Sequence, residues 1–302
     1  MRFAAARRFC AHAYKSSSGD FQQLHQLWHR NGVVWPIEVL PTSDAHSLGK
    51  SLLNEVGDPS HFKDNELMYY KSHLVFSVVD KLARHPGILA RVSKILGSSD
   101  VLLWDSSIPI KPPVAEGQPG GFFPWHQDAT YWGLDPLDGV VTCWVALSSC
   151  TKSHGCMRVV LGSHGQGQMP HRLAPAPSAM VRRGQTVDGV DEKIARHIEL
   201  QAGEMSMHHG RVLHASDENR SSEHRVGVVL NYLSPTTVPH TGIGSATLVA
   251  GTCDSPHWRL SQHRPKPSHI PDAASIAAHR EALSVHRGEL RAVDGARDMP
   301  QK

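Results

Sequence analysis

Two segments of the chain carry side chains that could bind one metal ion together. The first is FPWHQDATYWGL, with His126 and Asp128, and the second is GEMSMHHGRVLHASDENRSSEHRVGVVLNY, with His214 and Arg225. Two histidines and one carboxylate can hold one face of an Fe(II) ion and leave adjacent positions open for an oxidant and O₂. An arginine can clamp the far carboxylate of a 2-oxo acid. Together these residue types suggest oxygenase chemistry.

The spacing of His126 and Asp128 suits a strand or the end of one, because residues i and i+2 of a strand point to the same face. The third ligand must come from elsewhere in the fold, and we expect it to be His214. With 22 histidines in 302 residues, a His-x-Asp tripeptide carries little information by itself. A structural histidine is the plain alternative, and only the aromatic, turn-like context before a strong strand favours a metal site.

The composition predicts an ordinary globular protein, with 40% hydrophobic residues, 20% charged residues and a net charge of +3. At 302 residues the chain fits one large domain, since β-sandwiches and barrels often reach this size. No nucleic-acid motif or basic stripe is present, so we expect no nucleic-acid partner. No apolar run is long enough for a membrane helix, so we expect no membrane partner. A small-molecule substrate is the expected partner, and the oligomeric state stays open.

The cysteines indicate reduced thiols in an intracellular protein. Their number is odd and no Cys-x-x-Cys pair occurs, which argues against a disulfide framework or a zinc ribbon. The five are Cys10, Cys143, Cys150, Cys156 and Cys253.

The first 19 residues, MRFAAARRFCAHAYKSSSG, have the composition of a mitochondrial or plastid transit peptide. They contain four basic residues and several alanines and serines, and no acidic residue occurs before Asp20. The alternative is a disordered basic tail. We therefore expect an intracellular protein, mitochondrial or plastid if the segment targets it and cytoplasmic otherwise.

Helices are expected mainly in the first third of the chain and strands after residue 101. Apolar spacing predicts a helix over 21–32, and a cap at Ser43 or Asp44 predicts a second helix to about Val56. A third helical stretch is expected over 74–96, with a Pro86-Gly87 turn signal inside it. A strand is expected over 33–40, and its proline keeps it at an edge or end. Short β-branched runs separated by turn residues predict further strands. This pattern favours a mainly β, α+β fold, with helices on one side of a two-sheet sandwich or jelly roll. The later strands are expected over 101–110, 140–148, 156–162, 196–201, 204–209 and 225–233.

Several segments, taken in order and spacing, resemble the phytanoyl-CoA dioxygenase family of Fe(II)/2-oxoglutarate oxygenases. The resemblance covers roughly residues 20–262 and implies a double-stranded β-helix (jelly-roll, cupin-like) core with flanking N-terminal helices. Residues 263–302 are then a proline-rich linker followed by a helix over 273–291 and a tail. The matching segments are KPP (111–113), PWHQDATYWGL (124–134), WVALSSCTKSHGCMRVVLGSH (144–164), GEMSMHHGRVLHASDENRSSEHR (203–225) and GSATLV (244–249).

The resemblance also implies roles for individual residues. His126, Asp128 and His214 would bind Fe(II), and Arg225 would pair with the distal carboxylate of 2-oxoglutarate. The neighbouring His208 and His209 are expected to be strand and pocket-wall residues rather than ligands. Further residues implied at the cosubstrate are Ser216, Trp144, Gln127 and Ser107.

The implied activity is that of a dioxygenase, in which Fe(II), 2-oxoglutarate and O₂ hydroxylate an unactivated C–H bond of a small molecule and release succinate and CO₂. Because Asp128 is present, a halogenating variant is not expected. Three alternatives stay open. The same centre could epimerise, desaturate or cyclise; the jelly roll could bind a small molecule without catalysis; or the site could hold zinc.

The substrate is poorly defined by the sequence. Tyr131 and Trp132 follow the metal motif and could either line a pocket or pack under the edge of the sandwich. A long polar segment over 165–191 is expected to be a functional loop. Its basic residues could meet an anionic substrate or could simply be solvated. They are His171, Arg172, Arg182 and Arg183.

Overall fold

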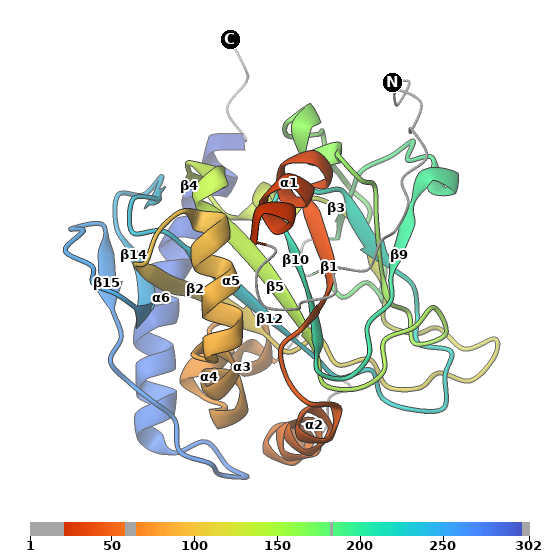
Figure 1. Ribbon diagram of the computed structural model, residues 1–302, viewed down its shortest axis with the longest axis horizontal. Helices are drawn as coiled ribbons and strands as arrows, with labels where there is room; N and C mark the ends of the chain where they lie inside the picture. The colour runs from red at the N-terminus through yellow and green to blue at the C-terminus, as the bar shows by residue number, and fades with distance from the viewer. Residues whose placement is uncertain (1–20, 58–64, 182–183, 298–302) are drawn as a thin grey trace.

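The computed structural model describes residues 21–57, 65–181 and 184–297, which form an α+β structure built on two β-sheets (Figure 1). The large sheet has the strand order β1-β10-β5-β12-β2-β14-β15, and the small sheet has the order β3-β11-β6-β9. Side chains from both sheets line one pocket between them. The predicted jelly-roll architecture with flanking helices is therefore confirmed.

Most strands are short, and neighbours in a sheet are often far apart in the sequence. The large sheet consists of β1 (Val33–Glu38), β10 (Glu204–His208), β5 (Val140–Ala146), β12 (Gly227–Leu233), β2 (Val101–Ser107), β14 (Gly244–Ala250) and β15 (Trp258–Leu260). The small sheet consists of β3 (Phe123–His126), β11 (His214–Ser216), β6 (Met157–Val159) and β9 (Arg196–Ile198). Two minor pairs are β4 (Leu134–Asp135) with β13 (Val238–Pro239), and β7 (Arg172–Leu173) with β8 (Gln185–Thr186).

The helices gather on the large sheet, on the side away from β3 and β9 (Figure 1). Helix α1 packs on β1 and on α5, α5 packs on β5 and β2, and α6 packs along β14. The helices are α1 (Phe21–Asn31), α2 (Thr42–Val56), α3 (Glu66–Tyr69), α4 (Ser77–Ala83), α5 (Pro86–Leu96) and α6 (Ala273–Arg297).

Alternation along the strands separates the helical core from the pocket. In β5 every residue is buried. Val141, Cys143 and Val145 belong to the apolar core that the helices share with the large sheet. Thr142 and Trp144 point the other way and line the pocket. A strand that is buried on both faces needs apolar residues throughout, which explains the near-continuous hydrophobic run VVTCWVA.

Several predicted boundaries were wrong for identifiable reasons. The predicted helical stretch 74–96 begins later than expected and divides near its Pro86-Gly87 turn signal into α4 and α5. Pro86 takes the first-turn position of α5, where its missing N–H costs nothing. Helix α2 begins at Thr42, before both predicted caps and without a side-chain cap, so Ser43 and Asp44 lie inside its first turn. Strand β11 was not predicted, since three residues are too few to show a period, and β3 was expected only from the spacing of His126 and Asp128.

Two further predicted elements are confirmed, and the suspected targeting segment is not described by the structure. Strand β1, which contains a proline, lies at the edge of the large sheet as predicted. The C-terminal helix is confirmed and extends to Arg297. The suspected targeting segment, residues 1–19, lies outside the described residues. Within the described ranges, no helix is both long and apolar enough to cross a bilayer, and the four cysteines found there are unpaired.

The packing of α1 against the core can be tested with a matched pair of leucines. Leu24 is 0% exposed and Leu173 is 69% exposed. We expect Leu24→Ala to lower the free energy of unfolding by about 2–5 kcal/mol, because it leaves a cavity under the helix. Leu173→Ala should change it by less than about 0.5 kcal/mol. Urea denaturation followed by circular dichroism measures both, and equal losses would mean that α1 is not docked as described.

Candidate metal centre and cosubstrate pocket

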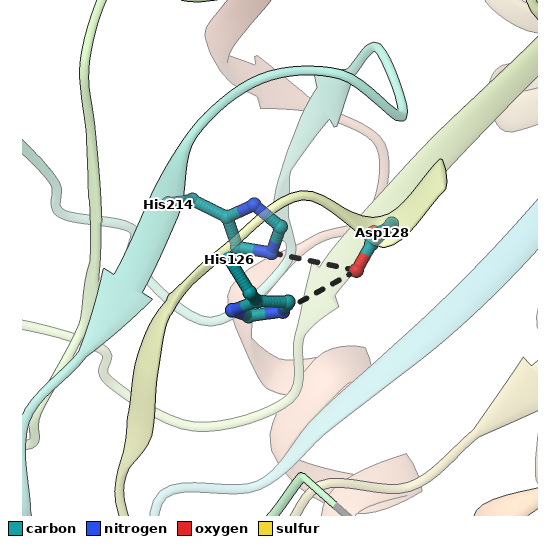
Figure 2. A group of neighbouring side chains, drawn as sticks. All are labelled: His126, Asp128 and His214. Carbon is teal, nitrogen blue, oxygen red and sulfur yellow. Dashed lines mark ion pairs between the residues drawn. The ribbon is translucent and has the colours of Figure 1, made fainter. Parts of the chain in front are cut away.

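The predicted ligands His126, Asp128 and His214 lie together in the pocket between the two sheets (Figure 2). One potential ligand atom from each residue lies within 4.8 Å of the other two. Oδ1 of Asp128 is 3.4 Å from Nε2 of His126 and 3.6 Å from Nε2 of His214. Both histidines are buried, with 5% and 7% of their surface exposed. The sequence prediction of this triad agrees with the geometry.

Strand pairing explains how the three side chains meet. Strand β11 runs antiparallel to β3, and His214 lies directly opposite His126. Their ring centroids are 4.1 Å apart. Gln127 is extended, with φ −119° and ψ 127°. Asp128 therefore returns to the same side as His126 even though β3 has already ended, as the i, i+2 spacing predicts.

Backbone carbonyls fix which nitrogen of each ligand histidine carries the proton. Nδ1 of His126 donates to the carbonyl of Pro124 at 2.7 Å, and Nδ1 of His214 donates to the carbonyl of Val212 at 2.9 Å. A carbonyl can only accept, so both Nδ1 atoms carry hydrogen and both Nε2 atoms present a lone pair to the cluster. Two bare nitrogens and a carboxylate oxygen that converge without a donor between them fit a bound cation.

Electrostatics favours the metal-binding protonation states. Burial, aided by the nearby His126, lowers the pKa of His214 to about 3, so this ring is neutral at physiological pH. Burial alone would raise the pKa of Asp128, but His214, His126 and His208 together hold it well below its usual range. The cluster thus offers the neutral imidazole of His214, the carboxylate of Asp128 and the ring of His126, the residue types typical of a non-haem Fe(II) site.

The guanidinium of Arg225 is buried in the same pocket, with 2% of the residue exposed. It donates to the carbonyls of Gly155 and Pro109 and lies 5.4 Å from the ring centroid of Trp144. Among the described residues no carboxylate pairs with Arg225, and its Nε has no hydrogen-bond partner. A buried cation without a counter-charge is costly, so this group fits an anionic ligand.

A second buried basic side chain, that of Lys111, lies beside it. Its Nζ donates to Oγ of Ser216 at 2.7 Å and also to the carbonyl of Asp217. Burial and the neighbouring Arg225 lower the pKa of Lys111 well below its usual range. Lys111 therefore orients the hydroxyl of Ser216, which lines the pocket. Lys111 was named from the sequence only as part of the KPP motif, and its contact with Ser216 was not predicted.

The remaining predicted cosubstrate residues divide into two groups. Trp144 and Ser107 line the pocket, as the resemblance implies. Gln127 does not, and this prediction needs correction. Because it alternates with the two ligands on either side of it, its side chain turns away and binds both the loop that follows β6 and the segment between β10 and β11. Its amide nitrogen donates to the carbonyls of Gly167 and Arg211, and its amide oxygen accepts from the amide of Met169.

His208, the last residue of β10, contacts the metal cluster without belonging to it. Its Nε2 lies 3.3 Å from Oδ2 of Asp128, the oxygen that faces away from the other two histidines. An ionised carboxylate only accepts, so Nε2 of His208 carries the hydrogen, the tautomer opposite to that of His126 and His214. Its Nδ1 is buried and has no partner among the described residues. His208 thus holds Asp128 so that Oδ1 alone points into the cluster.

Other predicted residues occupy several different places. Tyr131 and Trp132 line the pocket, which settles the choice left open by the sequence. His209 binds Asp138 instead of the metal cluster. Arg172 is exposed and pairs with Asp188, while the ring of His171 accepts from the amide of Gln127. Arg182 and Arg183 lie outside the described residues.

The role of His208 can be tested by replacing its ring with one that has no donor. We expect His208→Phe to weaken Co(II) binding by about tenfold or more, because residues that orient a ligand typically contribute this much to affinity. His208→Gln, which keeps an N–H donor, should recover part of the loss. His209→Phe is the control, since this buried neighbour binds Asp138 instead. Visible absorbance of bound Co(II) measures both the affinity and the coordination geometry. An unchanged Co(II) affinity in His208→Phe would contradict the role of His208 in holding Asp128.

Comparison with known proteins agrees with this geometry. The family model described as phytanoyl-CoA dioxygenase (PhyH) matches residues 60–227, more than half of the 302-residue chain. A probable phytanoyl-CoA dioxygenase of Caenorhabditis elegans is 24% identical over 62% of this chain and 62% of its own length. A probable alpha-ketoglutarate-dependent hypophosphite dioxygenase of Stutzerimonas stutzeri is 28% identical over 57% of this chain and 59% of its own. The chain spans less than two thirds of either relative.

Similarity to a solved structure extends further along the chain. The apo structure of ThoJ, described as a non-heme monooxygenase, is 29% identical and superposes with a TM-score of 0.76. It covers 90% of this chain and 99% of its own. The match of the family model includes all three triad residues and Arg225, in the arrangement described above. The chain belongs to the phytanoyl-CoA dioxygenase (PhyH) family.

Proposed function

We propose that this protein is an Fe(II)- and 2-oxoglutarate-dependent dioxygenase that hydroxylates an unactivated C–H bond of a small molecule and releases succinate and CO₂. His126, Asp128 and His214 would hold the iron. Arg225 and Ser216 would hold the distal carboxylate of 2-oxoglutarate. The membership of the family and the donor set of the triad both support this assignment.

The strongest support for this proposal is the buried guanidinium of Arg225. The pocket that contains the triad also contains the buried guanidinium of Arg225, which has no carboxylate partner among the described residues. A metal site alone does not need such a group. An acid that binds the metal at one end and the guanidinium at the other explains both features.

The side chains of this pocket would bind and orient the cosubstrate and would exclude water. The planar guanidinium of Arg225 can hold a carboxylate with two parallel hydrogen bonds, and the hydroxyl of Ser216, oriented by Lys111, can add a third. Several aromatic side chains also line the pocket and would help to keep water out. When bound, iron with 2-oxoglutarate would supply the activation of O₂, since the cofactor carries the oxidative step.

The alternatives account for fewer observations. A zinc site would use the same three ligands, but would leave the buried Arg225 without a role. A non-catalytic binding module would need neither the triad nor the guanidinium. Epimerisation, desaturation or cyclisation at the same centre would use the same residues, and product analysis by mass spectrometry distinguishes them.

The substrate would occupy the pocket beside the triad, a cavity of about 180 Å³. An anionic substrate was predicted from the basic loop. Arg172 already pairs with Asp188 there, and neither Arg172 nor His171 lines the pocket. An anionic substrate would therefore have to meet Arg182 or Arg183, and the prediction stays open for these two.

The cofactors are tested by anaerobic titration of the protein with Fe(II) and 2-oxoglutarate. We expect wild type to develop the weak visible charge-transfer band of a 2-oxo acid bound to Fe(II). His214→Ala should lose the band, because only two ligands remain. Arg225→Ala should need at least about tenfold more 2-oxoglutarate, since it loses a buried charge-assisted pair. His240→Ala, an exposed histidine, is the control.

The outcomes separate the candidate functions. Metal binding without the band in wild type would contradict the proposal and favour zinc or a binding module. A band that persists unchanged in Arg225→Ala would leave the metal assignment intact and contradict the cosubstrate assignment.

A close contact in the cosubstrate pocket gives a second test. A Cβ on Gly227 would lie 2.2 Å from Cζ2 of Trp144, so Gly227→Ala must displace the indole that lies over Arg225. We expect this variant to raise the 2-oxoglutarate concentration needed for half-saturation while Co(II) affinity stays unchanged. Gly165→Ala is the control, because a Cβ there meets nothing within 4 Å. An unchanged half-saturating concentration of 2-oxoglutarate in Gly227→Ala would mean that Trp144 does not shape the cosubstrate site.

A further inference from the structure

Two parallel rows of side chains cross the large sheet and face the triad. The first, which we call the cosubstrate row, joins Ser107, Val229, Trp144 and Ser206 across β2, β12, β5 and β10. The second, the substrate row, lies two residues further along each strand, about 7 Å away. It joins Asp105, Asn231, Thr142 and His208. All four of its members line the pocket.

The two ends of the substrate row have different neighbours. At one end His208 touches the metal ligand Asp128. In the middle Thr142 donates to the amide oxygen of Asn231 at 2.8 Å, which turns the amide nitrogen of Asn231 away from Thr142. At the far end lies Asp105, a carboxylate that the metal centre does not use.

Asp105 is buried, with 8% of its surface exposed, and only one of its oxygens is engaged. Oδ1 accepts from the backbone amide of Lys71 at 2.7 Å. The ammonium of Lys71 itself donates to the carbonyls of Trp104 and Ser245. No ion pair reaches Asp105 from any residue that the structure describes. The other nearby ionisable group is His279 of α6, and burial lowers its pKa, which leaves it uncharged at neutral pH.

The second oxygen of Asp105 therefore accepts from none of the residues that the structure describes. A carboxylate in a largely apolar pocket is costly unless a positive or hydrogen-bonding group meets it. One oxygen has a structural task, since it holds Lys71 in a left-handed conformation with φ 48°. The remaining oxygen has no such task, so it fits a ligand group.

The surroundings of Asp105 favour a cation over a neutral donor. Two aromatic pairs line this part of the pocket: Tyr69 with Tyr70, at 4.7 Å between ring centroids, and Trp104 with Trp132, at 5.8 Å. The faces of such rings attract positive charge and provide apolar contact for the carbon atoms next to it. A neutral donor would give the carboxylate only a hydrogen bond, whereas a nitrogen cation adds the attraction between opposite charges.

We propose that the substrate carries a protonated amine or a similar nitrogen cation, which binds the Asp105 carboxylate while its C–H bond faces the triad. This inference rests on the proposed function, since it takes the pocket to be the substrate site of the dioxygenase. It also defines orientation, because the cation would lie at one end of the substrate row and the reacting carbon near the other.

Three probes of similar shape and different charge test the proposal: benzylammonium, benzyl alcohol and benzoate. The whole pocket, including the part assigned to the cosubstrate, has a volume of about 180 Å³, and a single aromatic ring fits in about 150 Å³. The titration without the cosubstrate therefore leaves room for each probe. The full-length protein is titrated with each probe, with Ni(II) and 2-oxoglutarate and again without them. Quenching of tryptophan fluorescence reports binding, since Trp104 and Trp132 line the pocket, and calorimetry confirms the affinities.

We expect benzylammonium to bind at least about fivefold more tightly than either other probe. Asp105→Asn should abolish this preference, because asparagine still accepts from the amide of Lys71 but carries no charge. Asp254→Asn, at an exposed aspartate, is the matched control and should keep it. If Asp105→Asn does not fold, Tyr69→Leu should weaken benzylammonium more than benzyl alcohol.

Equal binding of the three probes, tighter binding of benzoate, or no binding of benzylammonium up to about 10 mM would overturn the proposal. Tighter benzoate would instead favour the anionic substrate predicted from the basic loop. The titration does not depend on iron chemistry. A protein that prefers the cation but never forms the Fe(II)–2-oxoglutarate band would contradict the proposed function alone, and the reverse result would contradict this inference alone.

Discussion

The site depends on the antiparallel pairing of β11 with β3. This pairing places His214 opposite His126 although 88 residues of sequence number separate them (214 − 126 = 88). Each strand is too short to be stable alone. Strand β3 lies at the edge of the small sheet, and β11 is held on its other side by β6, which pairs in turn with β9. The metal ligands are therefore only as well placed as the small sheet is well formed. Backbone carbonyls next to each histidine complete the arrangement by fixing the ring tautomers.

Several polar groups of the pocket are buried with few hydrogen-bond partners. Arg225, Asp105 and Nδ1 of His208 are polar groups in an enclosed space, each with less hydrogen bonding than its chemistry allows. Folding alone would favour apolar side chains at such positions. Their presence agrees with the general finding that proteins depart from packing rules where they bind ligands.

Much of the architecture was predictable because it rests on local patterns. Apolar spacing located α1 and α2, and β-branched runs located β5 and β12. The metal triad was predicted from residue type and family resemblance. Asp105 was not, because it lies in the run VLLWDSSIPI, which reads as an ordinary buried strand, and a register shift between β12 and β2 decides which residues of it face the pocket. The contact of His208 with Asp128 likewise depends on how β10 meets β3 in space, which no local pattern records.

The alternation of the central strands has a consequence for how new specificities could arise. Between the substrate row and the cosubstrate row lie Ser106, Leu230, Cys143 and Met207, which are buried on the helical side of the sheet. Positions 142 and 231 can thus change while the residues that join sheet to helices stay the same, and position 105 can change as long as it still accepts from the amide of Lys71. The cosubstrate row is spared as well, since it lies two residues away along the same strands. Within this scaffold, a new ligand preference and an intact metal triad are separable traits, because they depend on different residues.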